Sequence, residues 1–403
     1  MQGVRKTIGI LTLPLLILSI IVGILFSSDH PALSAADNGQ PAQITTLPQP
    51  RVSVITFTPV QADLAAQDQL TPTSLPVQVL ATATPASGSS ADSSSSAIPT
   101  SPPDEFAYAP PEKVTTCAEI WQIPSMPNDL PAILVFPPSI DDLKTEYNYY
   151  YLAAMLIQNK AVNASSCANN GLQSATTANQ CGVELAKPKI LSWQNSYDSR
   201  IFETGVRFGL PSRLLKKVFA LESQFWPGIY IDITESGLGQ LNETGADALL
   251  MYNSDFYNQF CPLVLHPATC AKGYLGLGYE GRSLLRGALV RQVNASCDSC
   301  PMGINTIKAM NSIPIFGEVL KANCSQVDML IGNTTDKKAG QAADYVDLWK
   351  LTLANYNVGP GCTADAIQKA WEKDQSLAWG TVSQYFQRDE CAGAPFYVND
   401  IFK

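Results

Sequence analysis

The stretch PSRLLKKVFALESQFWPG, residues 211–228, carries the clearest fold signal in the chain. Proline suits the first position of a helix and the pair Pro-Gly ends one, so the stretch predicts a helix that begins at Pro211 and stops at Pro227. Apolar residues at helical spacing recur within 140–160 and from Ile190 onward, whereas alternation of apolar and polar residues is rare. The sequence therefore predicts a mainly α-helical fold.

Glu222 stands on the apolar face of this predicted helix, four residues after Val218 and three after Phe219. We expect its carboxyl group to be half-buried there. Because burial disfavours the charged form, it raises the pKa of a carboxyl group, and a glutamic acid that stays protonated near neutral pH can act as a general acid. The pattern indicates glycosidic cleavage, although a structural hydrogen bond or ion pair of Glu222 would also account for it.

Three motifs follow one another along the chain: LESQFWP at 221–227, GLGQ at 237–240 and ANYNVGPG at 354–361. Their order, and the spacing of fifteen residues between Glu222 and the first glycine of GLGQ, resemble the catalytic domain of lytic transglycosylases of the SLT type, glycoside hydrolase family 23. This family belongs to the lysozyme-like superfamily and is related to goose-type lysozyme. The resemblance covers roughly residues 190–382.

The resemblance implies a lysozyme-like, helix-dominated α+β fold and an enzyme that cleaves the β-1,4 bond between N-acetylmuramic acid and N-acetylglucosamine in peptidoglycan. It implies that Glu222 is the catalytic acid/base, with Ser223 beside it as a supporting hydrogen-bonding group at the substrate. It also implies that the Tyr356 hydroxyl meets the Glu222 carboxyl, and that Asn357 binds substrate. The alternatives are a helix C-terminal hydroxyl for Ser223 and a core tyrosine for Tyr356.

The GLGQ motif corresponds to the family's Gly-Leu-Met-Gln, so the resemblance assigns Gly237, Leu238 and Gln240 to substrate binding. Glycines there let the backbone approach a sugar, and the Gln240 amide can hydrogen-bond it. Glycine in place of methionine at position 239 removes a side chain that lines the family's groove. Taken alone, GLGQ would equally fit an ordinary turn entering a helix.

Glu235 departs from the transglycosylase pattern, because that family carries a small apolar residue thirteen positions after the catalytic Glu. Goose-type lysozymes place an acidic residue at this offset and release the sugar by attack of water. Glu235 is therefore a third candidate catalytic residue, as a group that positions or activates water. Without such a base, the C6 hydroxyl of the substrate attacks the anomeric carbon, and the product is a 1,6-anhydromuramoyl end.

The chain contains ten cysteines, all beyond residue 112, and an even set of this kind predicts disulfides formed outside the cytoplasm. Gln240 and Tyr356 are 116 positions apart, more than the family needs, so we expect a disulfide-stabilised insertion around 251–300. Cys297 and Cys300 have the C-x-x-C spacing of zinc ligands, but no second pair of this spacing exists. We therefore expect no metal, and glycosidic cleavage by an acid requires no cofactor.

Arg5 and Lys6 precede an uncharged apolar run from Ile8 to Phe26, which predicts an export signal. The run is about long enough to cross a bilayer, so residues 1–27 are either a cleaved signal peptide or a retained transmembrane anchor. Both alternatives place the remaining chain outside the cytoplasm, in the cell envelope.

The rest of the chain divides by composition. Residues 28–112 are rich in Pro, Ser and Thr and predict a disordered linker. Residues 113–189 are expected to form a helical accessory region, and residues 190–403 the lysozyme-like domain.

The net charge of −9, with 26 Lys and Arg against 35 Asp and Glu, gives no basic patch and argues against nucleic acid as a partner. The expected partners are peptidoglycan glycan strands, the membrane through the N-terminal segment, and an envelope-spanning machinery. Two alternatives from other classes are a catalytically silent glycan-binding module and a structural envelope protein whose Glu222 is satisfied in a core.

Overall fold

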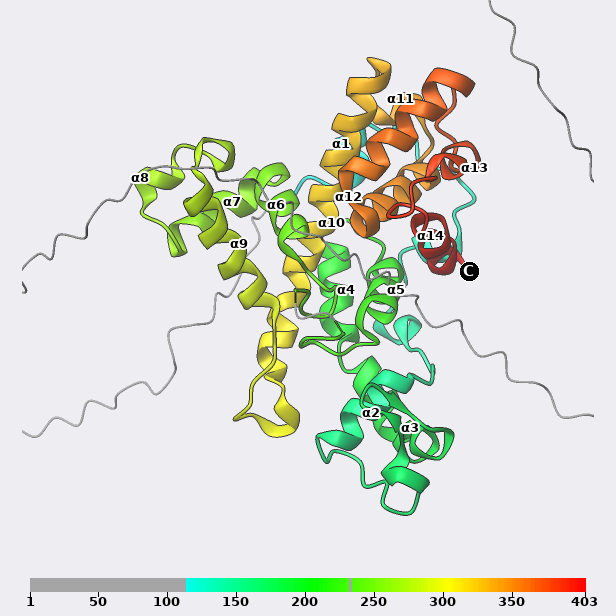
Figure 1. Ribbon diagram of the computed structural model, residues 1–403. Coiled ribbons are helices and arrows are strands. Elements are labelled where there is room, and N and C mark those ends of the chain that lie inside the picture. The colour runs from blue at the N-terminus through cyan, green and yellow to red at the C-terminus, as the bar shows by residue number, and fades with distance from the viewer. Residues whose placement is uncertain (1–113, 232–233) are drawn as a thin grey trace, which may run out of the picture. The chain divides into compact units, whose positions relative to one another are not determined.

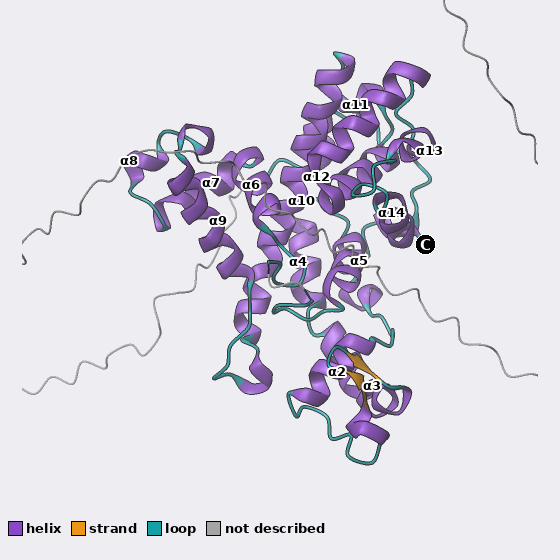
Figure 2. Ribbon diagram, viewed as in Figure 1, coloured by secondary structure: helices purple, strands orange, loops and turns teal. Residues whose placement is uncertain are grey.

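The computed structural model describes residues 114–231 and 234–403, which are predominantly helical (Figure 2). The helices are α1 Cys117–Trp121, α2 Tyr150–Gln158, α3 Gln180–Asn195, α4 Asp198–Phe208, α5 Ser212–Ser223, α6 Glu243–Tyr252, α7 Ser254–Phe260, α8 Pro267–Cys270, α9 Tyr279–Val293, α10 Thr306–Thr335, α11 Ala339–Ala342, α12 Tyr345–Asp374, α13 Trp379–Val382 and α14 Ala394–Phe402. Strands β1 Leu172–Ser174 and β2 Thr177–Ala178 form one antiparallel hairpin. The prediction of a helix-dominated, disulfide-containing fold is confirmed, and the segments 1–27 and 28–112 lie outside the described residues.

Helices α10 and α12, each of 30 residues, lie side by side and form the core of the fold (Figure 1). Every residue from Ser312 to Cys324 of α10 is buried, so this helix is covered on all sides, by α1, α4, α6, α9 and α12. Asn305 caps its N-terminus, where the Asn305 side chain accepts a hydrogen bond from the Lys308 amide. Helix α10 is therefore the element on which the others are positioned.

Helix α5 confirms the predicted helix, with Pro211 at its N-cap. It ends at Ser223, earlier than predicted, because Gln224 and Phe225 adopt left-handed backbone conformations with φ of 48° and 64°. The Phe225 side chain is fully buried and stacks on Tyr197, with ring centroids 6.4 Å apart. The burial of Phe225 holds the chain in this left-handed turn, so the helix has already ended when the chain reaches Pro227.

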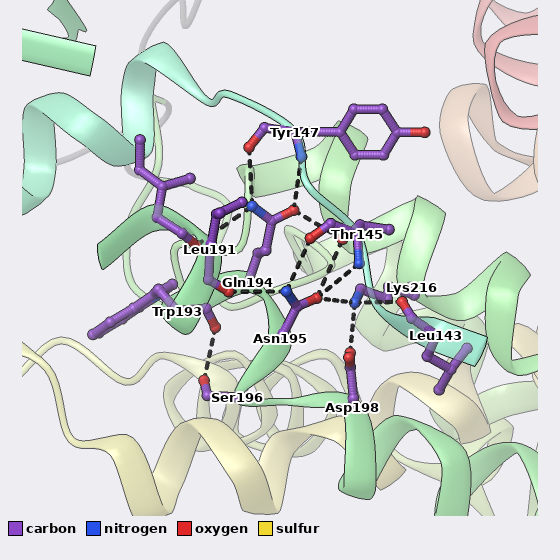
Figure 3. Close-up of polar contacts among 11 residues, drawn as sticks. Leu143, Thr145, Tyr147, Leu191, Trp193, Gln194, Asn195, Ser196, Asp198 and Lys216 are labelled. Atoms are coloured by element: carbon purple, nitrogen blue, oxygen red, sulfur yellow. Dashed lines mark hydrogen bonds and ion pairs between the residues drawn. The ribbon is translucent and has the colours of Figure 1, made fainter. Parts of the chain in front are cut away.

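The region 140–160 is helical only in part, although its apolar spacing suggests one helix. A 3-10 turn covers Ile140–Leu143, residues 144–149 are extended, and α2 begins at Tyr150. Figure 3 shows why: side-chain amides of α3 bind the extended backbone. Asn195 Oδ1 accepts from the Thr145 amide at 2.9 Å, and Gln194 Nε2 donates to the Tyr147 carbonyl at 2.9 Å. These partners replace the hydrogen bonds of a helix, so the helix expected over 144–149 is wrong.

Lys216 of α5 lies in the same polar cluster and is almost fully buried (Figure 3). Its ammonium donates to Asp198 Oδ1 of α4 at 2.6 Å, to Asn195 Oδ1 at 2.8 Å and to the Leu143 carbonyl at 2.7 Å. A buried ammonium is tolerated when its protons have such partners. The cluster thus fixes the start of α4, the middle of α5 and the end of the 3-10 turn relative to one another.

All ten cysteines are paired: Cys117–Cys324, Cys167–Cys181, Cys261–Cys270, Cys297–Cys300 and Cys362–Cys391. Two of these disulfides lie within or at the edge of the expected insertion around 251–300, which contains α7, α8 and α9. Cys297 and Cys300, weighed above as zinc ligands, are joined to each other. Disulfides are typical of proteins in an oxidising environment outside the cytoplasm.

The expected accessory region 113–189 is fastened to the rest of the described chain. Cys117 of α1 is bonded to Cys324 of α10, and Trp121 Nε1 donates to the Cys324 carbonyl at 3.1 Å. Helix α3 runs without interruption through Lys189, the boundary suggested by the sequence. Within residues 114–231 and 234–403, no helix combines the length and apolarity needed to cross a membrane.

Candidate active site

Glu222 is the penultimate residue of α5 and is half-buried, as its place on the apolar face predicts. Its carboxylate Oε1 accepts a hydrogen bond of 2.6 Å from the hydroxyl of Tyr397, which belongs to α14. The two residues are 175 positions apart in the sequence. The C-terminal helix therefore contributes directly to the surroundings of the candidate acid.

The pKa of Glu222 is raised from 4.5 to about 8. Burial is the main cause, because it removes water from the charged form, and the negative charge of Glu235 adds to the effect. The hydrogen bond from Tyr397 acts in the opposite direction, since it stabilises the carboxylate. The balance leaves Glu222 mostly protonated at neutral pH, as a general acid must be.

Tyr397 is a residue that the sequence reasoning missed. Burial and the neighbouring Glu222 and Tyr356 raise its pKa well above the usual value, so its hydroxyl keeps the proton that it donates to Glu222. The only sequence signal is its position three residues after Ala394 and four before Ile401, both buried, which places it on the inner face of α14. That signal identifies a core-facing tyrosine but not its partner.

Tyr356 lies in α12, three residues before Gly359. The backbone of Gly359, with φ 78° and ψ 172°, is not helical and breaks the helix there. Its hydroxyl donates to the Gly239 carbonyl, so the expected contact with the Glu222 carboxyl is made instead by Tyr397. The pKa of Tyr356 is strongly raised, mainly by burial. The charges of Glu222 and Glu235 contribute to this shift, so Tyr356 is close to both. The two tyrosines and two glutamates form one cluster.

The GLGQ motif forms a tight turn between Ser236 and Leu241. The backbone amide of each of these two residues donates to the carbonyl of the other. Gly237 has φ +81°, and a Cβ there would lie 2.8 Å from the Val293 carbonyl oxygen. At Gly239 a Cβ would lie 2.5 Å from Phe316 Cδ1 and 2.6 Å from the Tyr356 hydroxyl. Glycine at position 239 is thus required by the close approach of Phe316 from α10 and Tyr356 from α12.

Ser223 and Leu238 are both fully buried. The Ser223 hydroxyl lies 2.8 Å from the Leu238 carbonyl and 3.2 Å from that of Phe219, its partner one helical turn earlier. It thereby ties the end of α5 to the GLGQ turn. Both residues, expected at the substrate by resemblance, are buried at this junction.

Gln240 and Asn357 are placed differently from each other. Gln240 is 7% exposed, has φ of 50°, and donates from Nε2 to the Gly237 carbonyl at 2.7 Å. Asn357 is exposed on α12, one residue after Tyr356. Of the five residues expected to bind substrate by resemblance, Asn357 has the most accessible side chain.

Glu235 is half-buried immediately before the GLGQ turn. Its Oε1 accepts a hydrogen bond of 3.2 Å from Asn242 Nδ2, while Asn242 Oδ1 caps α6 by accepting from the Gly245 amide at 2.9 Å. Its charge acts on both Glu222 and Tyr356. The structure therefore brings the second carboxyl predicted by the sequence into the neighbourhood of the first.

Two further tyrosines adjoin this cluster. Burial raises the pKa of Tyr230 to about 12, and the charge of the nearby Glu222 adds to this effect. Its ring meets that of Tyr151 from α2 edge-on, with centroids 4.1 Å apart, and the Tyr151 hydroxyl donates to the Tyr230 carbonyl at 2.6 Å. Helix α2 of the expected accessory region thus contacts the segment that follows the candidate acid.

Chemically, the cluster offers one protonated carboxyl, a second carboxyl nearby and two tyrosine hydroxyls that hold their protons. Within the described part of the chain, no group of three or more His, Cys, Asp or Glu side chains is arranged to hold a metal ion. Comparison of the chain with protein-family models, curated proteins and solved structures yields no match.

Proposed function

We propose that this protein is a lytic transglycosylase with a lysozyme-like catalytic fold, which cleaves the β-1,4 bond between N-acetylmuramic acid and N-acetylglucosamine in peptidoglycan. The observation that carries the proposal is the half-buried Glu222 carboxyl, with its pKa raised to about 8 and its Oε1 held by Tyr397. A carboxyl group with these properties holds a proton at neutral pH in a fixed orientation. The motif resemblance independently selects the same residue.

In the proposed reaction, Glu222 donates its proton to the glycosidic oxygen as the bond breaks. The resulting carboxylate then accepts the proton of the C6 hydroxyl of the muramoyl residue, which attacks the anomeric carbon and closes the 1,6-anhydro ring. Tyr397 stabilises the carboxylate between these two steps, because its hydroxyl donates to Oε1 at 2.6 Å. Tyr356 acts indirectly: its hydroxyl donates to the Gly239 carbonyl and so positions the GLGQ turn.

A hydrolase is the second candidate function, and the proximity of Glu235 favours it. A carboxylate close enough to raise the pKa of Glu222 can also orient a water molecule for attack on the anomeric carbon. The product would then be a reducing muramoyl end. The choice between the two functions depends on whether Glu235 acts on water or only stabilises the turn through Asn242.

The disulfides support action outside the cytoplasm. Together with the apolar run Ile8–Phe26, they fit an enzyme that works on the cell wall from the membrane surface. In this proposal the glycan strands of peptidoglycan are the substrate, and wall remodelling or the opening of the wall for an envelope-spanning machinery is the role.

The test is digestion of purified peptidoglycan by the full-length protein, with the products identified by mass spectrometry. We expect 1,6-anhydro-muropeptides, and we expect Glu222→Gln to reduce their formation by about a hundredfold or more, the contribution typical of a general acid. Glu372→Gln is the matched control, because Glu372 is exposed on α12 and accepts a hydrogen bond from Gln368, one helical turn earlier. This variant should digest at the rate of the unchanged protein.

The variant Glu235→Ala separates the two candidate reactions. Anhydro products that persist in Glu235→Ala support the transglycosylase, whereas reducing-end products that disappear in this variant identify a lysozyme. A protein that binds peptidoglycan without releasing either product would be a glycan-binding module, and the proposal of an enzyme would be wrong.

A further inference from the structure

The loop between α9 and α10 contains a disulfide within the sequence CDSCP, residues 297–301. Cys297 and Cys300 are only three positions apart, against separations from 9 to 207 in the other four pairs. Both cysteines are partly exposed, whereas every other disulfide has at least one buried cysteine. Cys181 of the Cys167–Cys181 pair is exposed as well, but its partner Cys167 is buried. Because a thiolate must approach a sulfur atom directly to attack it, the Cys297–Cys300 disulfide is the one of the five that is open to exchange at either cysteine.

Opening this disulfide costs the fold little. A covalent link stabilises a protein mainly by restricting its unfolded chain, and the restriction grows with the length of chain enclosed. The link from Cys297 to Cys300 encloses the shortest segment of all. The protein can therefore remain folded with these two thiols reduced while the other pairs stay oxidised.

The backbone of this loop depends on its closure. Met302 has φ of 61°, a left-handed conformation that a non-glycine residue keeps only when its surroundings enforce it. The Cys297 amide donates to the Gly303 carbonyl at 2.9 Å, and Ser296 pairs with Ile304 across the loop. The disulfide lies between these two hydrogen-bonded ends and Met302 follows it by two residues, so we expect its opening to let Met302 leave this conformation.

The same loop is bonded to the segment that follows the candidate acid. The Ala295 amide donates to the Pro227 carbonyl at 3.0 Å, and the Ile229 amide donates to Ser296 Oγ at 3.3 Å. From there the Gly228 carbonyl accepts from the Gly237 amide at 3.0 Å, which leads into the GLGQ turn. A continuous series of hydrogen bonds thus joins the Cys297–Cys300 loop to the backbone beside Glu222.

We propose that Cys297 and Cys300 form a thiol–disulfide exchange site for a protein dithiol, and that reduction of this site loosens the segment 227–231 and slows the candidate enzyme. One thiolate of the dithiol attacks a sulfur of the pair, which forms a mixed disulfide and releases the other cysteine as a thiolate. The second thiol of the partner then displaces the remaining cysteine. Two electrons and two protons pass to Cys297 and Cys300, and the partner becomes a disulfide.

The exchange site is tested on the full-length protein with dithiothreitol as the dithiol, followed by alkylation and mass spectrometry. We expect Cys297 and Cys300 to be alkylated at a dithiothreitol concentration about tenfold lower than the six cysteines of the three buried pairs, Cys117–Cys324, Cys261–Cys270 and Cys362–Cys391, require. The buried pairs serve as internal controls in the same sample. Reduction of Cys297–Cys300 together with, or after, the buried pairs would overturn the proposal.

The connection to the site is tested by amide hydrogen exchange, which needs no enzymatic activity. In the selectively reduced protein and in Cys297→Ser/Cys300→Ser, exchange of the Ile229 amide in segment 227–231 should rise by about tenfold, since its hydrogen bond to Ser296 is weakened. The matched control Cys261→Ser/Cys270→Ser removes a disulfide between α7 and α8 and should leave this segment unchanged. Unaltered exchange in 227–231 on reduction would disprove the coupling.

Only the regulatory consequence rests on the proposed function. Cys297→Ser/Cys300→Ser should digest peptidoglycan at least about threefold more slowly than the oxidised protein, with the Cys261→Ser/Cys270→Ser control unaffected. Equal rates for the reduced and oxidised protein would contradict the regulation. If the oxidised protein itself releases no product, the proposed muramidase function fails, while alkylation and hydrogen exchange still decide whether the exchange site exists.

Discussion

The proton on Glu222 links the chemistry of the site to the stability of the protein. In the folded chain the pKa of this carboxyl is about 8, whereas in the unfolded chain it is near 4.5. Between these two values the folded protein binds one proton more than the unfolded chain does, so rising pH favours unfolding. The stability contribution of Glu222 is therefore most favourable below about pH 4.5, falls as the pH rises to about 8, and is constant above that.

We predict that Glu222→Gln stabilises the protein progressively over this pH range, because glutamine has no charge to bury. The difference in free energy of unfolding between variant and unchanged protein should be near zero at about pH 4.5 and reach about 2 to 4 kcal/mol at about pH 8.5. Urea denaturation at a series of pH values measures it. A difference that does not change with pH would show that Glu222 is ionised in the folded protein.

The hydroxyl of Tyr397 gives a second prediction at the residue scale. Its hydrogen bond stabilises the Glu222 carboxylate, so Tyr397→Phe should raise the pKa of Glu222 further. The descending alkaline limb of the pH–rate profile should move up by about half a unit or more, while the maximal rate falls, since the carboxyl loses its orientation. The peptidoglycan digest, repeated across pH, provides the measurement.

Tyr385→Phe is the control for this change, because the Tyr385 hydroxyl donates to Asp374, and neither residue is among the groups that shift the pKa of Glu222. It removes one tyrosine hydroxyl without altering the alkaline limb. An alkaline limb that is unmoved in Tyr397→Phe would mean that another group, and not Glu222, is responsible for that limb.

Glu222 could be found from the sequence because its apolar neighbours lie within one helical turn. Tyr397 could not, since its relation to Glu222 depends on how α14 packs against α5, across 175 positions. The resemblance led to Tyr356 for this contact, and that tyrosine lies nearby but bonds Gly239. Local periodicity thus identified the acid, while the partner that orients it required the three-dimensional structure.

At the scale of elements, the GLGQ turn is held by close packing with α10 and α12. We predict that Gly239→Ala destabilises the protein by about 1 to 3 kcal/mol, because its Cβ would lie 2.5 Å from Phe316 and 2.6 Å from the Tyr356 hydroxyl. Cleavage of peptidoglycan should fall as well, since Tyr356 must move. Thermal unfolding and the digest measure the two effects.

Gly287→Ala is the matched control for this substitution. Gly287 lies within α9, and a Cβ there would have no atom within 4 Å, so alanine should stabilise the helix by about 0.5 to 1 kcal/mol. Equal stability of the Gly239→Ala and Gly287→Ala variants would show that the turn accommodates a side chain.

The extended segment 144–149 is a place where the spacing of apolar residues predicts the wrong secondary structure. Its apolar spacing continues that of α2, so periodicity alone extends the helix backward. The amides of Gln194 and Asn195, fifty residues away in the sequence, bind its backbone instead. Hydrogen bonds between distant elements thus override a local pattern that is otherwise correct from Tyr150 onward.

At the scale of the whole molecule, the disulfide Cys117–Cys324 joins α1 to the centre of α10 and encloses 207 positions of sequence. We predict that Cys117→Ser/Cys324→Ser lowers the free energy of unfolding by about 3 to 5 kcal/mol, since restriction of the unfolded chain grows with the enclosed length. Urea denaturation at constant pH is the measurement. Cys297→Ser/Cys300→Ser, which opens the shortest loop, should cost markedly less, and the reverse order would contradict this account.

The even number of cysteines predicted disulfides, but neither their spacing nor the resemblance determined which residues pair. Cys324 lies after the expected insertion around 251–300 and is bonded to Cys117, near the start of the described chain. Helix α10 brings the two cysteines together because it runs through the core and reaches α1. Pairing is thus a consequence of packing between elements far apart in sequence.

Because of this pairing, Cys117, which is synthesised first, can form its native disulfide only after Cys324 has been made. Cys117 leaves the ribosome first, and six other cysteines, from Cys167 to Cys300, follow before its partner Cys324 is made. Those six close within short local segments, whereas Cys117 must wait as a free thiol or exchange out of a wrong partnership once Cys324 arrives. The yield of correctly folded protein in an oxidising compartment will therefore depend on disulfide isomerisation, and a host cell that can only form disulfides will accumulate chains trapped through Cys117.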